Sequence, residues 1–138
     1  MIDDNTGVVI LAAGKGTRMQ SNRAKVLHPL AGRPIIAYVL DTALKIAGSN
    51  TVVVIGNQAE AVRQKVSEQA EVAFAYQEEQ LGTGHAVQCA LPALASHIRN
   101  VLILCGDVPL IREQTLHRLL KTHLQAKNAV TLLGVNLD

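Results

Sequence analysis

Apolar residues fall in short runs that alternate with longer stretches of mixed polarity. The run Val8–Ala13 contains no polar residue, and β-branched or aliphatic runs recur at Thr51–Ile55 and Asn100–Cys105. Short runs without polar alternation are typical of strands that a parallel sheet buries on both faces. We therefore predict strands at these three runs, with a shorter one at Glu71–Tyr76 and a last one at Ala129–Val135.

The stretches between these runs repeat apolar residues at helical spacing. We predict helices from Pro34 to a stop at Gly48, and over Gln58–Gln69, His85–Ala95 and Arg112–Lys127. Pro92 should end or kink the third helix, because proline removes a backbone donor and clashes with the preceding turn.

Strands that alternate with helices indicate an α/β fold. We expect a three-layer α/β/α sandwich on a mainly parallel, Rossmann-like sheet. A chain of 138 residues without repeat or linker fits one domain with a substantial core.

Composition excludes several classes of partner. The formal charge is +2, and one Phe, two Tyr and no Trp leave few aromatic platforms for stacking bases, so we expect no nucleic acid or membrane partner. Cys89 and Cys105 are far apart and form no CxxC pair, which predicts two reduced, buried thiols rather than a zinc site or disulfide. The first residues, Met-Ile-Asp-Asp, lack the basic start of a signal peptide, and we expect a cytoplasmic protein.

Three polar loops, at residues 12–18, 77–84 and 106–109, each follow a predicted strand. Ligands of open α/β sheets bind beyond the carboxyl ends of the strands, so these loops should meet at one site. Gly14 and Gly16 let the backbone approach a ligand, and Arg18 and Lys25 supply positive charge. This pattern predicts a phosphate-binding loop, while a basic turn that faces water remains the alternative.

Two common nucleotide motifs do not fit. The Walker loop requires a glycine where Val9 stands, and the dinucleotide motif GxGxxG requires one at Met19. The acidic residue that would bind a ribose after the second strand is replaced by Asn57.

Four segments match a known family together: L-A-A-G-K-G-T-R-M at 11–19, K-V-L-H at 25–28, Q-L-G-T-G-H-A at 80–86 and G-D-V-P-L at 106–110. They resemble the sugar-1-phosphate nucleotidyltransferases. The resemblance is closest to the uridyltransferase domain of the bacterial bifunctional N-acetylglucosamine-1-phosphate uridyltransferase / glucosamine-1-phosphate acetyltransferases. It implies a sheet of the nucleotide-diphospho-sugar transferase type and transfer of UMP from UTP to N-acetylglucosamine 1-phosphate, with release of pyrophosphate.

The resemblance also implies a role for individual residues. Backbone groups would contact the nucleoside and its phosphates at Leu11, Ala12, Ala13 and Gly14. Gln77 would bind the uracil edge, and Gly82 and Thr83 would close around base and ribose. Cys105 and Gly106 would form the wall beside Asp107.

Catalysis would depend on charge. Arg18 and Lys25 would hold the phosphates, with a planar guanidinium fork and a compact ammonium group respectively. Asp107 would bind Mg²⁺, which prefers oxygen ligands and retains several waters. Without the resemblance, Asp107 could instead begin the turn before Pro109, and Lys25 could be an ordinary surface lysine.

Two departures from the family pattern matter. Ala24 stands where proline often precedes the lysine, which should leave the backbone ahead of Lys25 freer. The family's domain is also longer than this chain and is followed by a trimerising acetyltransferase domain. We therefore expect residues 1–138 to be a truncated, nucleotide-binding front portion that is impaired alone and belongs to a homotrimer when intact.

Two other functions stay open at this point. The first loop does not select a base, so transfer from dTTP or CTP remains possible. A non-catalytic nucleotide-binding module is the alternative from a different class.

Overall fold

Four parallel strands form the central sheet of the computed structural model, which describes residues 4–137. The strands are β1 (Thr6–Leu11), β4 (Thr51–Ile55), β5 (Ala73–Tyr76) and β6 (Asn100–Cys105), in the order β5-β4-β1-β6. The predicted fold class is confirmed, and the three strongest apolar runs became three strands of this sheet, with β1 and β4 inside it and β6 at one edge.

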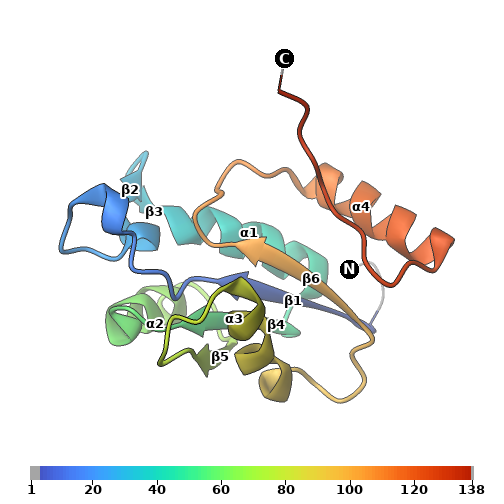
Figure 1. The fold of residues 1–138 in the computed structure, drawn as a ribbon, viewed down its shortest axis with the longest axis horizontal. Coiled ribbons are helices and arrows are strands. Elements are labelled where there is room, and N and C mark those ends of the chain that lie inside the picture. Colours follow the sequence, from blue (N-terminus) through green and yellow to red (C-terminus); the bar gives the residue numbers. More distant parts are fainter. Residues whose placement is uncertain (1–3, 138) are drawn as a thin grey trace.

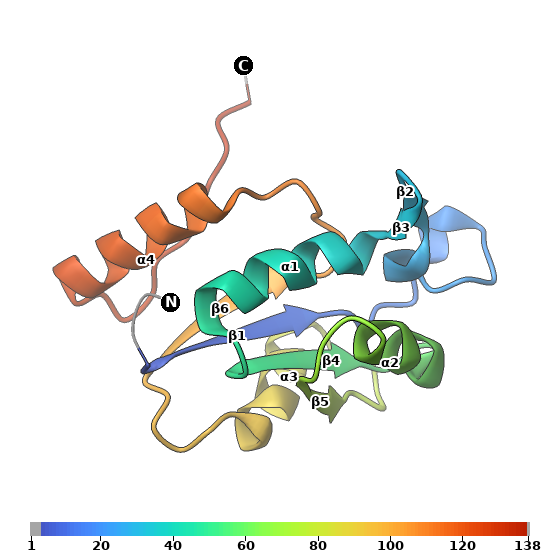
Figure 2. The ribbon, with the colours of Figure 1, turned by 180° about the vertical axis from the view of Figure 1, so that it is seen from behind.

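Helices cover both faces of this sheet (Figures 1 and 2). The core on one face joins the sheet to α1 (Ile35–Ala47), α2 (Ala59–Ser67) and α4 (Glu113–Ala126), whereas α3 (Thr83–Ala90) packs on the other face. Successive residues of β1 therefore enter different cores: Ile10 lies in the first and Val9 in the second, and both are fully buried. Burial on both sides explains why β1 shows no polar alternation.

Helix α1 illustrates how the sequence pattern becomes packing. Its buried residues include Ile36, Val39, Leu40 and Ala43, which recur three or four positions apart and so share one face. The helix ends at Gly48, whose backbone has a positive φ of 53° that glycine adopts without steric cost. The helix boundaries predicted from the sequence hold within a few residues, except that the third helix ends at Ala90 rather than Ala95.

Several short elements were not predicted. Residues 17–19 and 25–27 form single 3₁₀ turns, and β2 (Pro29–Leu30) pairs with β3 (Arg33–Pro34) in a small antiparallel hairpin. Helix α3 begins earlier than predicted, and a 3₁₀ turn over Leu91–Ala93 follows it at Pro92.

The predicted strand at Ala129–Val135 is wrong. Residues 128–137 form no strand, and Figure 1 shows them running back along α4 and then away from the sheet. Thr131 accepts a side-chain hydrogen bond from Asn128 (3.1 Å) and lies 3.0 Å from Nδ1 of His123 on α4. These contacts hold the segment to the end of α4, and a strand requires a hydrogen-bonding edge as well as β-branched residues.

The order of the sheet places the candidate site. β1 lies between β4 and β6, and the loops after β1, β5 and β6 leave the sheet at its carboxyl edge. None of the described helices is both long enough and apolar enough to cross a membrane.

Candidate functional site

A cavity of about 510 Å³ opens at the carboxyl edge of the sheet, and all three polar loops contribute to its wall. Every residue predicted for the site lines it except Gly106, whose backbone packs behind the wall. The predicted residues that line it are Leu11, Ala12, Ala13, Gly14, Arg18, Lys25, Gln77, Gly82, Thr83, Cys105 and Asp107.

The loop after β1 folds tightly against the segment that carries Lys25. Gly16 has a left-handed backbone (φ 58°), and a Cβ there would lie 2.7 Å from Cβ of Lys25. A larger residue would therefore push the two segments apart. Gly14 meets no such obstruction, because nothing lies within 4 Å of its missing Cβ.

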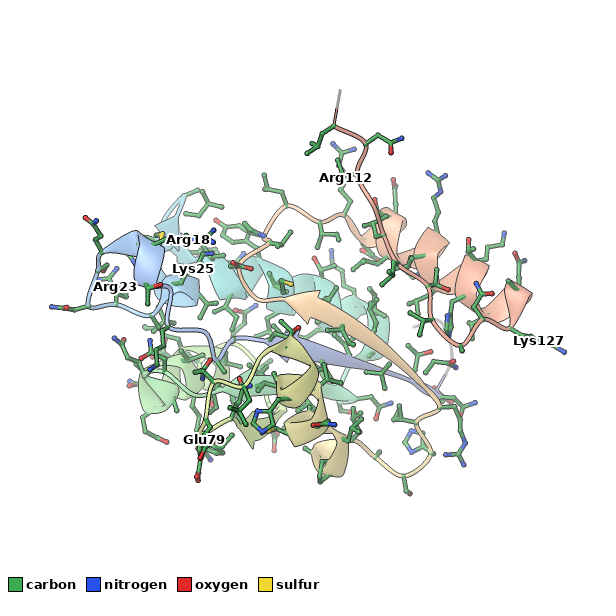
Figure 3. All side chains as sticks on the ribbon, viewed as in Figure 1. Arg18, Arg23, Lys25, Glu79, Arg112 and Lys127 are labelled. Atoms are coloured by element: carbon green, nitrogen blue, oxygen red, sulfur yellow. The ribbon has the colours of Figure 1, made fainter. Side chains whose placement is uncertain are left out.

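Arg18, Lys25 and Asp107 bring opposite charges to the cavity. Nζ of Lys25 lies 2.6 Å from Oδ2 of Asp107, and the two side chains are 42% and 33% exposed. Arg18 and Lys25 come from the same end of the molecule, far from Arg112 and Lys127 (Figure 3). Within residues 4–137 the guanidinium of Arg18 has no hydrogen bond or ion pair, so all of its donors can face a ligand.

Cys105 and Gly106 connect β6 to this charged group. The backbone N–H of Gly106 donates to the carbonyl of Leu11 (2.9 Å), and a Cβ at Gly106 would lie 2.8 Å from that oxygen. Cys105 is exposed rather than buried as predicted, because it lies in the cavity wall. Partial burial, followed by the negative charge of Asp107, raises the pKa of its thiol, which favours a wall residue over a thiolate nucleophile. Cys89 is half-buried, and both thiols are free, as predicted.

Gln77 is buried and its amide has a defined orientation. Its Nε2 donates to the carbonyl oxygen of Gly82 (3.0 Å) and lies 3.0 Å from Nδ1 of His85. An amide nitrogen only donates, so Nδ1 must accept, and the other ring nitrogen can donate to Sγ of Cys89 at 3.7 Å. Both donors of the Gln77 amide are used, and its Oε1 is left to accept a hydrogen bond from a ligand.

Gly56 allows the loops after β1 and β5 to meet. A Cβ at this position would lie 2.6 Å from the carbonyl oxygen of Gln77 and 3.1 Å from Cβ of Ala13. This close approach between distant segments is visible in the structure alone.

The donor set around Asp107 fits one type of metal site. Within the described residues, no three His, Cys, Asp or Glu side chains cluster as a closed metal site. A single half-exposed carboxylate facing a cavity suits Mg²⁺, which completes its coordination with waters and phosphate oxygens. The residues therefore fit a metal that arrives together with a phosphorylated ligand.

Gly16 also lines the cavity, and so do five residues that were assigned no role from the sequence: Thr17, Met19, Val26, Gln80 and Ala86. All of them lie inside the quoted motifs, so the motifs already marked these segments as part of the site. Val26 and Ala86 are buried apolar residues, and only the fold shows that they reach the cavity.

The curated relatives include "Bifunctional protein GlmU" of Pelobacter propionicus, which is 52% identical over 135 residues. That match covers 98% of this chain but only 29% of the relative, so the chain spans less than a third of the protein it resembles. The resemblance predicted from the four loop motifs is confirmed.

Solved structures share the fold at low identity. A nucleotidyl transferase from Methanothermobacter thermautotroptrophicus superposes with a TM-score of 0.75 at 23% identity, covering 86% of this chain and 58% of that one. Rv0371C of Mycobacterium tuberculosis, in a complex with manganese, gives a TM-score of 0.66 at 22% identity, covering 86% and 59%.

The match to a whole family is more decisive than any single relative. Residues 8–135 match the family described as the MobA-like NTP transferase domain, and this range holds every loop of the cavity. The chain belongs to this family of nucleotidyltransferase domains.

Proposed function

We propose that this chain forms the nucleotide-binding part of an enzyme that transfers UMP from UTP to N-acetylglucosamine 1-phosphate, yielding UDP-N-acetylglucosamine and pyrophosphate. One observation carries the proposal: Arg18, Lys25, Asp107 and Gln77 come from separate segments and line one cavity. The loop motifs and the 52% identity to a bifunctional GlmU protein support the choice of substrates. We further propose that residues 1–138 correspond to the front portion of such a transferase domain.

The basic side chains address the main obstacle to the reaction. Both substrates are polyanions, so their repulsion must be relieved before an oxygen of the sugar phosphate can attack the α-phosphorus. Arg18 can bind two non-bridging oxygens with its planar fork, and Lys25 can neutralise a third as a point charge. Catalysis of this kind depends on position and charge rather than on covalent intermediates.

Asp107 would hold Mg²⁺, and the metal would supply additional positive charge at the phosphates. In the structure Lys25 pairs with this carboxylate. If Asp107 held the metal instead, the ammonium group of Lys25 would be free to contact phosphate oxygens. The ion pair thus keeps both side chains directed into the cavity before substrates arrive.

The orientation of the Gln77 amide supports recognition of uracil. Its free Oε1 is an acceptor, and the N3–H of uracil is a donor on the edge of the base. The ring nitrogen of cytosine at the same position is an acceptor and would face Oε1 without a proton between them. Gln77 therefore favours UTP over CTP, while thymine keeps the same N3–H.

Calorimetric titration tests the proposal directly. UTP should bind the 138-residue chain with Mg²⁺ present, more weakly without it, and Asp107→Asn should remove the difference. CTP should bind at least about tenfold more weakly than UTP, the value of one hydrogen bond plus an unpaired acceptor. If UTP fails to bind with or without Mg²⁺, the site is not a preformed nucleotide site.

Turnover requires the rest of the transferase. A chimera in which this chain replaces the matching part of the Pelobacter propionicus relative should release pyrophosphate from UTP and N-acetylglucosamine 1-phosphate. The isolated chain should not. Equal turnover with dTTP or CTP would contradict the assigned substrate.

A further inference from the structure

The turn that carries Lys25 begins at a restrained residue. Ala24 is buried, with φ −52° and ψ 137°, and its carbonyl accepts a hydrogen bond from the N–H of Leu27 (2.9 Å). The preceding residues, Ser21 to Arg23, are exposed. The position of Lys25 therefore depends on how firmly the chain is held between Asn22 and Ala24.

Gln58 holds this part of the chain at two points. Its Oε1 accepts a hydrogen bond from the N–H of Ala24 (3.0 Å), and its Nε2 donates to the carbonyl oxygen of Asn22. Both partners are backbone groups, so the side-chain amide pairs with residues 22–24 as an adjacent strand would. These two hydrogen bonds restrain the backbone ahead of Lys25, where alanine by itself leaves it freer than proline would.

Gln58 itself stands on a rigid base. It follows β4, whose five residues are all buried, and its neighbour Asn57 donates a backbone hydrogen bond to the carbonyl of Ala13 (3.2 Å). Its backbone is left-handed, with φ 52°, a conformation that costs a non-glycine residue about 1 kcal/mol or more. Glycine would adopt this conformation at lower cost. A glutamine at this position therefore indicates that its side chain has a role.

We propose that Gln58 is a positioning residue for nucleotidyl transfer: its amide fixes residues 22–24 and thereby directs Lys25 into the cavity toward Asp107 and the phosphates. The inference rests on the proposed function, because it assigns Lys25 to the phosphates. Gln58 does not line that cavity and touches no substrate, so its effect passes entirely through the turn.

Hydrogen exchange tests the hydrogen bond without any nucleotide. In Gln58→Ala the amide proton of Ala24 should exchange at least about tenfold faster, because it loses its acceptor. Gln64→Ala is the matched control, since Gln64 is an exposed glutamine on α2. Unchanged exchange at Ala24 in Gln58→Ala would overturn the proposal.

A double-mutant cycle tests the coupling to Lys25. Gln58→Ala should weaken binding of UTP with Mg²⁺ by about fivefold to tenfold, and should change it less than about twofold in a Lys25→Ala background. Gln64→Ala should have no effect in either background. Equal losses in the two backgrounds would overturn the positioning role while leaving the nucleotide site intact.

Restoring the backbone restraint by another route tests the mechanism. The φ of Ala24 lies in the range that proline imposes, and proline has no N–H that needs an acceptor. Ala24→Pro should therefore recover most of the affinity lost in Gln58→Ala, and Gln58→Ala leaves room for the ring. A double variant no better than Gln58→Ala would overturn the proposal. Failure of the unaltered chain to bind UTP would remove the proposed function and the inference together.

Discussion

At the scale of single residues, Arg18 is the side chain whose mutation should affect catalysis most and folding least. It lines the cavity, and its guanidinium is unpaired within the described chain. A side chain without a structural partner can be removed with little effect on folding. Its mutation therefore reports on function.

Arg18→Ala should lower turnover of the chimera by about 10³-fold or more, by analogy with arginine fingers, and leave the melting temperature unchanged. Arg23→Ala is the matched control, because Arg23 is exposed, lies in the same segment and does not line the cavity (Figure 3). A loss below tenfold for Arg18→Ala would remove Arg18 from a catalytic role.

The ion pair between Lys25 and Asp107 leads to a prediction in which a mutation strengthens binding rather than weakening function. Lys25→Ala should strengthen binding of Mn²⁺, used as a probe for Mg²⁺, when no nucleotide is present, because the carboxylate no longer pairs with an ammonium group. The pair is partly exposed, so an increase of about fivefold is expected, equivalent to roughly 1 kcal/mol. Lys45→Ala removes a lysine that pairs with Glu113 instead, and should not change the affinity. The paramagnetic signal of free Mn²⁺ measures both.

The sequence alone was sufficient to identify some residues of the site but not others. The charged residues could be named from the motifs, because the charge that they contribute is a property of the residue type itself. The contributions of Gly56 and Gln58 could not, because each depends on segments about 20 to 45 residues away. The spacing of residues along the sequence does not reveal which distant segments come into contact.

At the scale of elements, the end of β4 acts as a support for its neighbours. Gly56 lies against both Gln77 and Ala13, which belong to the loops on either side of it. These contacts leave no space for a side chain at position 56.

Gly56→Ala should destabilise the chain by about 1–3 kcal/mol and weaken UTP binding, because the new Cβ would force apart the loops after β1 and β5. Gly84→Ala is the control: nothing lies within 4 Å of its missing Cβ, and it sits in helix α3, where alanine should add about 0.5–1 kcal/mol. Denaturant unfolding measures both changes. Equal stability of the two variants would show that the loops at Gly56 have room to move.

Strands and helices were predictable where burial alone decides them. β6 has the predicted bounds, and α1, α2 and α4 differ by a few residues at their ends. The segment 129–135 has the composition of a strand but lies beside α4, since side-chain contacts of Thr131 divert it. Local propensity cannot determine which edge of a sheet a segment will reach.

At the scale of the whole molecule, exposed apolar residues flank one edge of the sheet. β6 pairs only with β1, so its other edge is open within the described chain. Ile103 on this strand is 48% exposed, and the segment after α4 exposes large apolar residues as well: Val130, Leu132, Leu133, Val135 and Leu137. A second cavity, of about 580 Å³, separates this segment from β6.

An open edge flanked by apolar side chains favours pairing with another chain. We therefore expect the 138-residue chain to associate with itself as its concentration rises, which sedimentation velocity would detect as a shift to faster species. Ile103→Lys should suppress the shift, because a charge on an edge strand must lose water when strands pair. Leu30→Lys, on the β2–β3 hairpin far from β6, should not (Figure 1). If both variants associate like the unaltered chain, the contact lies elsewhere, and the open edge of β6 is sufficiently protected by its own surroundings.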